Sequence, residues 1–263
     1  GIVIAISALE ALKACGVDVT WTMALNSDEE TGSHHSAKAL RAEARKHDVG
    51  VVLEPATADG GLVTERMGSG TFQVEVFGKS AHVGRDFKSG VSAVLKLAEV
   101  MSAIGKLSDA EQGRIVNIGP VVGGGATNVV ADHAACWGNM RFANAKQAEE
   151  LVRAIEAMAT KDDVLPRVVV RVSANRPAKP ETEEVRGLAK VAREVSEELG
   201  MKLPFAKTGG VCDGNLLQEE GLPTVDTLGV RGGNLHREDE FVELDTIVAR
   251  CQLLAVFLMR ITA

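Results

Sequence analysis

Long apolar runs, basic stretches and closely spaced cysteines are all absent from this sequence of 263 residues. No apolar run reaches membrane-spanning length, which argues against a transmembrane protein. Lys and Arg do not gather in one stretch and the net charge is -7, so a nucleic-acid-binding surface is not expected. The four cysteines lie far apart without a Cys-x-x-Cys pair, which predicts reduced thiols in a cytoplasmic protein and no disulfide framework.

The first residues lack the marks of a secretory leader. No basic segment precedes the apolar run over residues 1–6, and no cleavage site follows it. The chain also begins without Met, so we expect it to start inside a longer protein. Its composition, with 45% hydrophobic and 25% charged residues, is typical of a globular protein with one large or two ordinary domains.

Helical and strand-like patterns alternate at both ends of the chain. A helix is predicted over residues 2–15, a strand over 19–25, a helix over 36–47 and a strand over 49–53. After a proline-marked boundary at 176–180, the expected elements are helices over 182–199, 213–220 and 245–261 and a strand near 224–228. This alternation favours an α/β layer with a largely parallel sheet.

The middle of the chain has a different order of elements. Strands are expected over residues 71–77, 115–122, 134–142 and 168–172, and helices over 91–104 and 145–159. This β-α-β-β-α-β order matches a ferredoxin-like module. We therefore predict an α+β module, residues 70–175, inserted into a discontinuous α/β domain made of residues 1–69 and 176–263.

Acidic and imidazole side chains follow several of the predicted strands. Glu29 and Glu30 come after the first strand, where an acid cluster is costly unless a cation such as a metal ion balances it. Glu54 follows the next strand, and ligands of an open α/β sheet gather at the carboxyl ends of its strands. His236 lies in a glycine-rich loop among acids. Carboxylates and imidazole together suit zinc, with cobalt or manganese as alternatives.

Each of these residues also has a purely structural interpretation. The acid pair can belong to a solvated loop that caps the next helix, Glu54 can simply end a strand, and His236 can be an exposed loop residue. His82, in the polar turn over residues 78–84, can be an ordinary turn residue. The glycine-rich segment 121–128 lacks the Walker lysine and does not lie between a strand and a helix, so it is not interpreted as a phosphate loop.

The order and spacing of these motifs resemble the dinuclear zinc aminoacylase and carboxypeptidase family. That family includes bacterial glutamate carboxypeptidase, acetylornithine deacetylase and succinyl-diaminopimelate desuccinylase. The resemblance implies that Glu29 is the general base and that Glu30, Glu54 and His236 are ligands of two zinc ions. As in the family, Glu30 and Glu54 would bind different ions, and His236 would complete the site. It also implies a zinc-peptidase-like catalytic layer and a ferredoxin-like lid that forms a homodimer interface.

The resemblance assigns further roles in the lid and in a second glycine-rich loop. His82 would reach the partner's active site and help to stabilise the tetrahedral intermediate. Asn128 would contact the substrate, and Arg141 would bind the substrate carboxylate. Gly209 and Gly210 would belong to the substrate-binding loop.

Two motifs of the family are missing from this sequence. Its His-x-Asp motif and its metal-bridging Asp before Lys-Gly-Gly would both precede Ile2, and Gly1 resembles the last residue of that Lys-Gly-Gly. We therefore expect this chain alone to be inactive. The full-length protein is expected to cleave the amide bond of N-acyl amino acids or small peptides with a free carboxylate. A non-catalytic scaffold that keeps the fold and the dimer module is the alternative.

Overall fold

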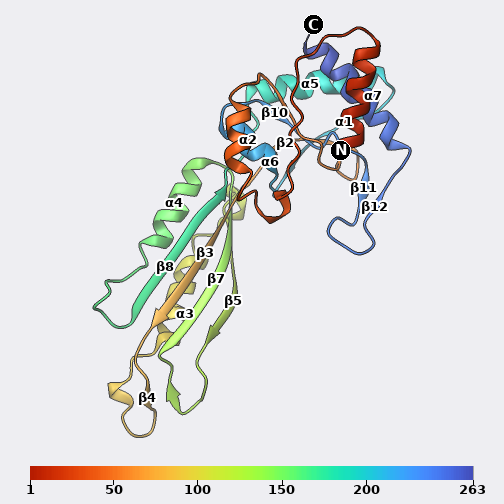
Figure 1. The fold of residues 1–263 in the computed structure, drawn as a ribbon. Coiled ribbons are helices and arrows are strands. Elements are labelled where there is room, and N and C mark those ends of the chain that lie inside the picture. The colour runs from red at the N-terminus through yellow and green to blue at the C-terminus, as the bar shows by residue number, and fades with distance from the viewer. Residues whose placement is uncertain (263) are drawn as a thin grey trace. The chain divides into compact units, whose positions relative to one another are not determined.

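Two separate stretches of sequence, Gly1–Arg66 and the chain from Lys179, form one unit, and Met67–Ala178 form another. The computed structural model describes residues 1–262 (Figure 1). From the sequence, the domain boundaries were predicted between residues 69 and 70 and between residues 175 and 176. We refer to the two parts as the discontinuous unit and the inserted unit.

The inserted unit is built on one four-stranded antiparallel sheet (Figure 1). Its strands are β3 (Gly68–Phe77), β5 (Ile115–Gly123), β7 (His133–Phe142) and β8 (Arg167–Arg176), in the spatial order β5-β7-β3-β8. Helix α3 (Ala93–Gly105) follows β3 and α4 (Ala145–Glu156) follows β7. This is the predicted β-α-β-β-α-β order, and it confirms the ferredoxin-like module.

A single hydrophobic core joins both helices to the sheet. On β3 the alternation of side chains buries Phe72, Val74 and Val76, as the sequence pattern predicts. Leu97 from α3 and Leu151 from α4 belong to the same cluster of buried residues. Both helices therefore cover the same face of the sheet, and each starts at a side-chain cap, Ser92 Oγ or Asn144 Oδ1.

The discontinuous unit consists of helices around short strands. Its helices are α1 (Ile2–Ala14), α2 (Ala37–Ala44), α5 (Glu183–Glu198), α6 (Asp213–Glu219) and α7 (Thr246–Ile261). Its strands are β1 (Gly50–Val51), β2 (Leu62–Arg66), β9 (Phe205–Thr208), β10 (Thr224–Val225), β11 (Gly232–Gly233) and β12 (Phe241–Val242). Strands β1 and β10 pair in parallel, as do β2 and β9, which agrees with the predicted α/β class.

The strand predicted over residues 19–25 is wrong. This segment has no regular secondary structure, and Trp21 and Leu25 are 52% and 66% exposed. A strand needs a neighbour that satisfies its backbone N–H and C=O groups, and among residues 1–262 no strand pairs with this segment. The apolar composition alone was therefore not sufficient to place a strand here.

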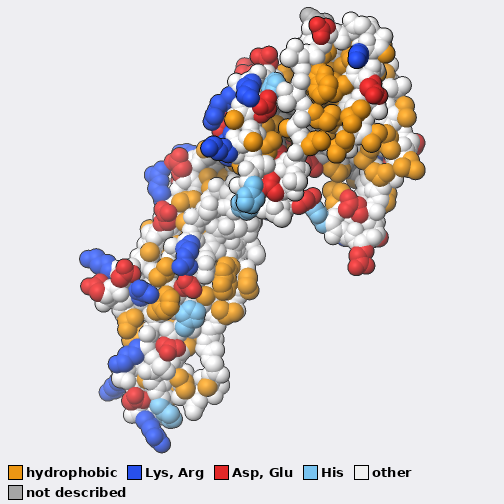
Figure 2. Space-filling model, viewed as in Figure 1, with side chains coloured by type: hydrophobic (Ala, Val, Ile, Leu, Met, Phe, Trp, Pro, Cys, Tyr) orange, Lys and Arg blue, Asp and Glu red, His pale blue; other side chains and the backbone are white. Residues whose placement is uncertain are grey.

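Helix α1 packs on α7 with only part of its apolar surface. Ile4 and Ala8 are buried with Leu254 of α7, while Ile2 and Val3 are exposed. Figure 2 shows apolar side chains gathered on this part of the discontinuous unit. No helix in residues 1–262 combines the length and the apolar character that a membrane span needs.

Candidate functional site

The acid pair lies in a single 3-10 turn, Glu29–Thr31. The preceding residue, Asp28, uses its carboxylate to accept hydrogen bonds from the backbone N–H groups of His35, at 2.8 Å, and Ser36, at 3.4 Å. Hydrogen bonds from Ser36 and His35 lower the pKa of Asp28. Asp28 therefore holds the backbone just before α2, so the interpretation of the acid cluster as part of a structural loop holds for this residue.

Asp213, in the first turn of α6, anchors the loop that carries the acid pair. Its Oδ1 accepts a hydrogen bond from Ser33 Oγ at 2.6 Å, and its Oδ2 accepts one from the side-chain amide of Asn26. The Asn26 amide oxygen in turn accepts a hydrogen bond from the backbone N–H of Asp28 at 2.9 Å. The 3-10 turn with Glu29 and Glu30 thus lies between Asn26 and Ser33, which both donate hydrogen bonds to the Asp213 carboxylate.

Glu30 and His236 come together in the discontinuous unit, although they are far apart in the sequence. His236 Nε2 lies 3.8 Å from Glu30 Oε2, and both side chains are about three-quarters exposed. His236 follows β11 with a φ of 64°, and Asn234 has a φ of 59°, in the left-handed region that Asn and His adopt more often than other residues with a side chain. A hydrogen bond from Asn234 Nδ2 to Asp239 Oδ2, at 2.8 Å, braces this loop.

Glu54 lies at the carboxyl end of a pair of parallel strands, but its neighbour there is Asp226. Glu54 follows β1 and Asp226 follows β10, and β1 pairs with β10. Burial raises the pKa of Glu54, Arg66 opposes this effect, and the negative charges of Asp226, Glu30 and Asp213 add to it. The sequence predicted that Glu30 and Glu54 would meet at two neighbouring strand ends, but the strand before Glu30 does not form.

The described residues fit part of a metal site. Carboxylate oxygen and imidazole nitrogen are ligands that zinc takes in proteins, and Glu30 with His236 supplies one of each at close range. Across residues 1–262, however, no three His, Cys, Asp or Glu side chains form a group that could hold one ion. Glu30 and His236 can therefore supply two ligands to one metal ion. Glu54 does not join them in a group that could hold that ion.

A buried charge cluster lies next to Glu54, and the sequence did not reveal it. The Asp226 carboxylate is fully buried and accepts hydrogen bonds from Arg66, and Lys179 Nζ lies 3.3 Å from Asp226 Oδ2. Burial lowers the pKa of Lys179, whereas for Arg66 the hydrogen bonds to Asp226 overcome the effect of burial and raise the pKa. Asp226 lies within the strand predicted near 224–228, and an acid inside an apolar strand was the signal that could have found it.

The second glycine-rich loop connects β9 to α6. Gly209 and Gly210 are both exposed, and the Gly210 backbone N–H donates to Thr208 Oγ1 at 3.2 Å. Cys212, after this loop, is buried, and burial raises the pKa of its thiol to about 12. A thiol with this pKa stays protonated at neutral pH and is a poor nucleophile.

In the inserted unit, His82 and Asn128 lie side by side. His82 belongs to β4 (Ala81–His82), which pairs with β6 (Val129–Val130), and the backbone N–H of Val83 donates to the backbone oxygen of Asn128 at 3.0 Å. The His82 ring is exposed, and its Nδ1 accepts a hydrogen bond from the Gly84 N–H at 3.1 Å. The structure thus brings these two predicted residues together at one end of the sheet.

Arg141 lies near the opposite end of the sheet. It is on β7, opposite Ser69 of β3 and Ile115 of β5, whereas the turn with His82 is linked to Asp132, just before β7, through a hydrogen bond from the Gly78 N–H. Burial lowers the pKa of the half-buried Arg141 guanidinium. The inserted unit therefore does not join Arg141 to His82 and Asn128 in one site.

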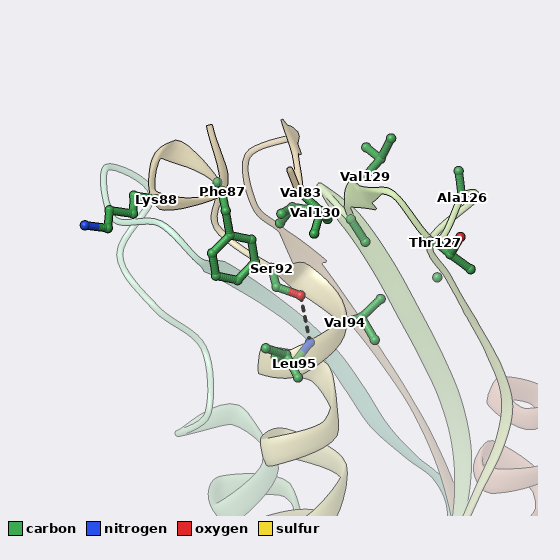
Figure 3. A pocket seen from close by; sticks show the side chains of 15 residues that line it. Val83, Phe87, Lys88, Ser92, Val94, Leu95, Ala126, Thr127, Val129 and Val130 are labelled. Atoms are coloured by element: carbon green, nitrogen blue, oxygen red, sulfur yellow. Dashed lines mark hydrogen bonds between the residues drawn. The ribbon is translucent and has the colours of Figure 1, made fainter. Parts of the chain in front are cut away.

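An open apolar pocket is lined by Val83, the residue after His82, and by Thr127 and Val129, the residues on either side of Asn128 (Figure 3). The β6 segment, the turn after β4, the start of α3 and the glycine-rich segment at the end of β5 all line it. Its apolar side chains include Val83, Phe87, Val94, Leu95, Val129 and Val130. Phe87 is 61% exposed and Leu95 is 68% exposed, so the inserted unit presents large apolar side chains on this surface.

The fold agrees with comparisons to known proteins. A family model described as a peptidase dimerisation domain matches residues 64–164. Carboxypeptidase G2 from Pseudomonas sp. (strain RS-16) is 27% identical over 224 residues, which cover 83% of this chain and 54% of that protein. The chain is therefore similar to M20 peptidases over residues 64–164 and to carboxypeptidase G2 over most of its length. This confirms the resemblance to the aminoacylase and carboxypeptidase family, and the chain spans about half the length of this curated relative.

Solved peptidase structures share the fold. A tripeptidase from Staphylococcus aureus subsp. aureus Mu50 superposes with a TM-score of 0.83 at 23% identity, over 98% of this chain and 70% of that one. YXEP from Bacillus subtilis, described as a dinuclear metal-binding peptidase of the M20 family, has a TM-score of 0.64 at 16% identity. That match covers 89% of this chain and 62% of the other.

Proposed function

We propose that this chain is part of a metal-dependent peptidase or amidohydrolase. Its substrates are N-acyl amino acids or small peptides with a free carboxylate, and the cleaved bond is an amide. The observation that carries the proposal is the approach of Glu30 and His236 to 3.8 Å, with Glu29 beside Glu30 in the same turn. The homology to carboxypeptidase G2 supports a hydrolase of this class.

Glu30 and His236 are proposed to hold one metal ion, and Glu54 a second. A dinuclear M20 relative supports two ions, and the remaining ligands would be the His-x-Asp motif and bridging Asp that the family resemblance places before Ile2. Zinc suits these ligands best, with cobalt and manganese as alternatives. When bound, such ions polarise the scissile carbonyl and lower the pKa of water.

Glu29 is proposed as the general base. Its carboxylate takes a proton from the attacking water and passes it to the leaving nitrogen, a transfer that a side chain next to a metal ligand is well placed to make. The hydrogen bonds of Asn26 and Ser33 to Asp213 hold the turn in which Glu29 lies. A restrained backbone at this turn supports the role of Glu29, because proton transfer needs a positioned carboxylate.

The protein is proposed to be a homodimer that pairs through the inserted unit. Strand β5 lies at one edge of the sheet, and its Ile115, Val121 and Val122 are exposed. The other edge strand, β8, carries Arg167 and Arg171, and charged side chains discourage pairing between edges. The β5 edge and the apolar surface in Figure 3 are therefore the favoured dimer surface.

The remaining predicted residues act on the substrate in this proposal. His82 of one subunit donates a hydrogen bond to the developing oxyanion in the partner's site, and Asn128 lies beside it. Arg141 pairs with the substrate carboxylate, and Gly209 and Gly210 border the substrate. The four free thiols support a location in the cytoplasm, where thiols stay reduced.

A substrate screen on the complete gene product that contains this chain tests the proposal. Purified protein is loaded with zinc, cobalt or manganese and assayed against N-acyl amino acids, dipeptides and tripeptides. We expect hydrolysis of substrates with a free carboxylate and reduced turnover for the matching amides. Bound metal without hydrolysis of any substrate would contradict the proposal and favour a scaffold.

A further inference from the structure

Asp213 accepts hydrogen bonds from both ends of the loop that carries Glu29 and Glu30. Asn26 precedes the Glu29–Thr31 turn and Ser33 follows it, and both side chains donate to the Asp213 carboxylate, one to each oxygen. The Asn26 amide also donates to Ser33 Oγ at 3.0 Å, so the two ends of the loop are joined to each other. These bonds link the loop to α6, a helix from the distant C-terminal part of the chain.

Burial and backbone conformation at Ser33 indicate that this contact stabilises the loop. Ser33 is fully buried and has a φ of 54°, a left-handed conformation that is unfavourable for a residue with a side chain. Asp213 is only 9% exposed, so its bonds are shielded from competing water. Hydrogen bonds to a buried carboxylate are strong enough to keep a strained residue in place.

An acid at the start of a helix often caps that helix, but in α6 the side chain of Asn215 does so. Its side-chain oxygen accepts a hydrogen bond from the Cys212 backbone N–H at 3.0 Å, which closes the first turn of α6. The carboxylate of Asp213 instead contacts side chains from another part of the chain. A purely local role in α6 therefore does not explain these contacts.

We propose that Asp213 is a positioning residue that fixes Glu29 and Glu30 relative to His236. The inference rests on the proposed function, because Glu29 and Glu30 matter only as base and metal ligand. Without the bonds from Asn26 and Ser33, the turn would move relative to His236, which a different loop carries. A shift of about 1 Å in such groups can lower a rate by roughly 100-fold.

Exchanging the amide and the carboxylate tests this role in the complete protein. Asp213→Asn leaves an amide facing the Asn26 amide, so one donor loses its acceptor. The double variant Asn26→Asp with Asp213→Asn restores an amide–carboxylate pair with reversed polarity and the original net charge. The carboxylate introduced at position 26 would still offer an oxygen to the Asp28 N–H. Asp245→Asn, an exposed acid before α7, is the matched control.

Two measurements separate positioning from general loss of structure. Hydrogen exchange of peptides spanning residues 26–36 reports the loop directly, and kcat and KM report its consequence. For Asp213→Asn we expect faster exchange confined to these peptides and a kcat lower by roughly 100-fold at little changed KM. The double variant is expected to recover most of both losses, and Asp245→Asn to behave as the wild type.

Other outcomes overturn the inference. We call the hydrogen bonds from Asn26 and Ser33 to Asp213 the clamp. Unchanged hydrogen exchange over residues 26–36 in Asp213→Asn would show that the clamp does not hold the loop. Faster exchange with unchanged kcat would show that catalysis does not need the loop to be positioned. If Asp213→Asn does not fold, Asn26→Ala, which removes one donor, must show the same local increase in exchange. A wild-type protein without hydrolase activity would refute the proposed function, while the exchange data would still decide whether the clamp exists.

Discussion

The buried carboxylate of Asp226 accepts two hydrogen bonds from the Arg66 guanidinium, at 2.8 Å from Nη2 and 3.1 Å from Nε. Lys179 approaches the same carboxylate, and the backbones of Arg66 and Lys179 exchange two hydrogen bonds of 2.9 Å. Arg66 is the last residue before the inserted unit and Lys179 the first after it. Asp226 therefore holds together the two segments of the discontinuous unit between which the insertion lies.

Removing this carboxylate is expected to be costly. In Asp226→Ala, two buried cations lose their partner, and the free energy of unfolding should fall by about 3–5 kcal/mol. Denaturant unfolding followed by circular dichroism measures the change. The control is Glu65→Ala, which removes the more exposed pair with Lys207 and should cost less than about 1 kcal/mol. Equal losses in the two variants would contradict the role of Asp226.

Thiol alkylation tests the burial of Cys212. Burial favours the neutral form of an acid, so a pKa of about 12 keeps this thiol protonated through pH 8, and only a thiolate reacts readily. At pH 8, iodoacetamide should modify the exposed Cys15 while Cys212 stays intact, and both should react in urea. Mass spectrometry of the peptides reads the result. Similar rates for the two cysteines in the folded protein would refute a buried, neutral Cys212.

Charge on the β5 edge should prevent dimerisation. Val121→Lys places a cation in the proposed interface, where burying it without a partner is costly, so the dimer should become a monomer at micromolar concentration. Ala174→Lys, at an exposed position on the other edge strand β8, should leave the dimer intact. Light scattering coupled to size-exclusion chromatography measures both masses. A dimeric Val121→Lys protein would place the interface elsewhere.

A mixture of two inactive variants should regain activity if the site is shared between subunits. His82→Ala removes the proposed oxyanion donor and Glu29→Ala removes the base, so each homodimer should be inactive. In a mixed dimer, one of the two sites receives an intact His82 and an intact Glu29. We expect up to one-half of the wild-type activity per mixed dimer, after mixing under conditions that exchange subunits. Absence of rescue in verified mixed dimers would argue against a shared site.

The sequence predicted the inserted unit well because local patterns determine it. Alternation of Phe72, Val74 and Val76 marks the buried face of β3, and helical spacing marks α3. The strand over residues 19–25 failed because a strand also depends on a neighbouring strand, which the composition of one segment does not report.

The site depends on contacts that local patterns do not contain. Glu30 and His236 were singled out by their loop context and by a family resemblance, and their approach to 3.8 Å depends on the fold. Asp213 was missed because its partners, Asn26 and Ser33, lie far away in the sequence. Asp226 was overlooked because it lies within the strand predicted near 224–228, whereas in the structure β10 ends at Val225 and Asp226 follows it.

Separating metal binding from turnover at the two adjacent carboxylates tests the central claim most directly. Glu29→Gln and Glu30→Gln are compared in the complete protein by elemental analysis and by the rate of hydrolysis, with the exposed Glu10→Gln on α1 as control. Glu29→Gln should keep the wild-type metal content and lose roughly 100- to 10,000-fold in kcat, whereas Glu30→Gln should lose metal. Full metal content with near wild-type turnover in Glu29→Gln would contradict the account.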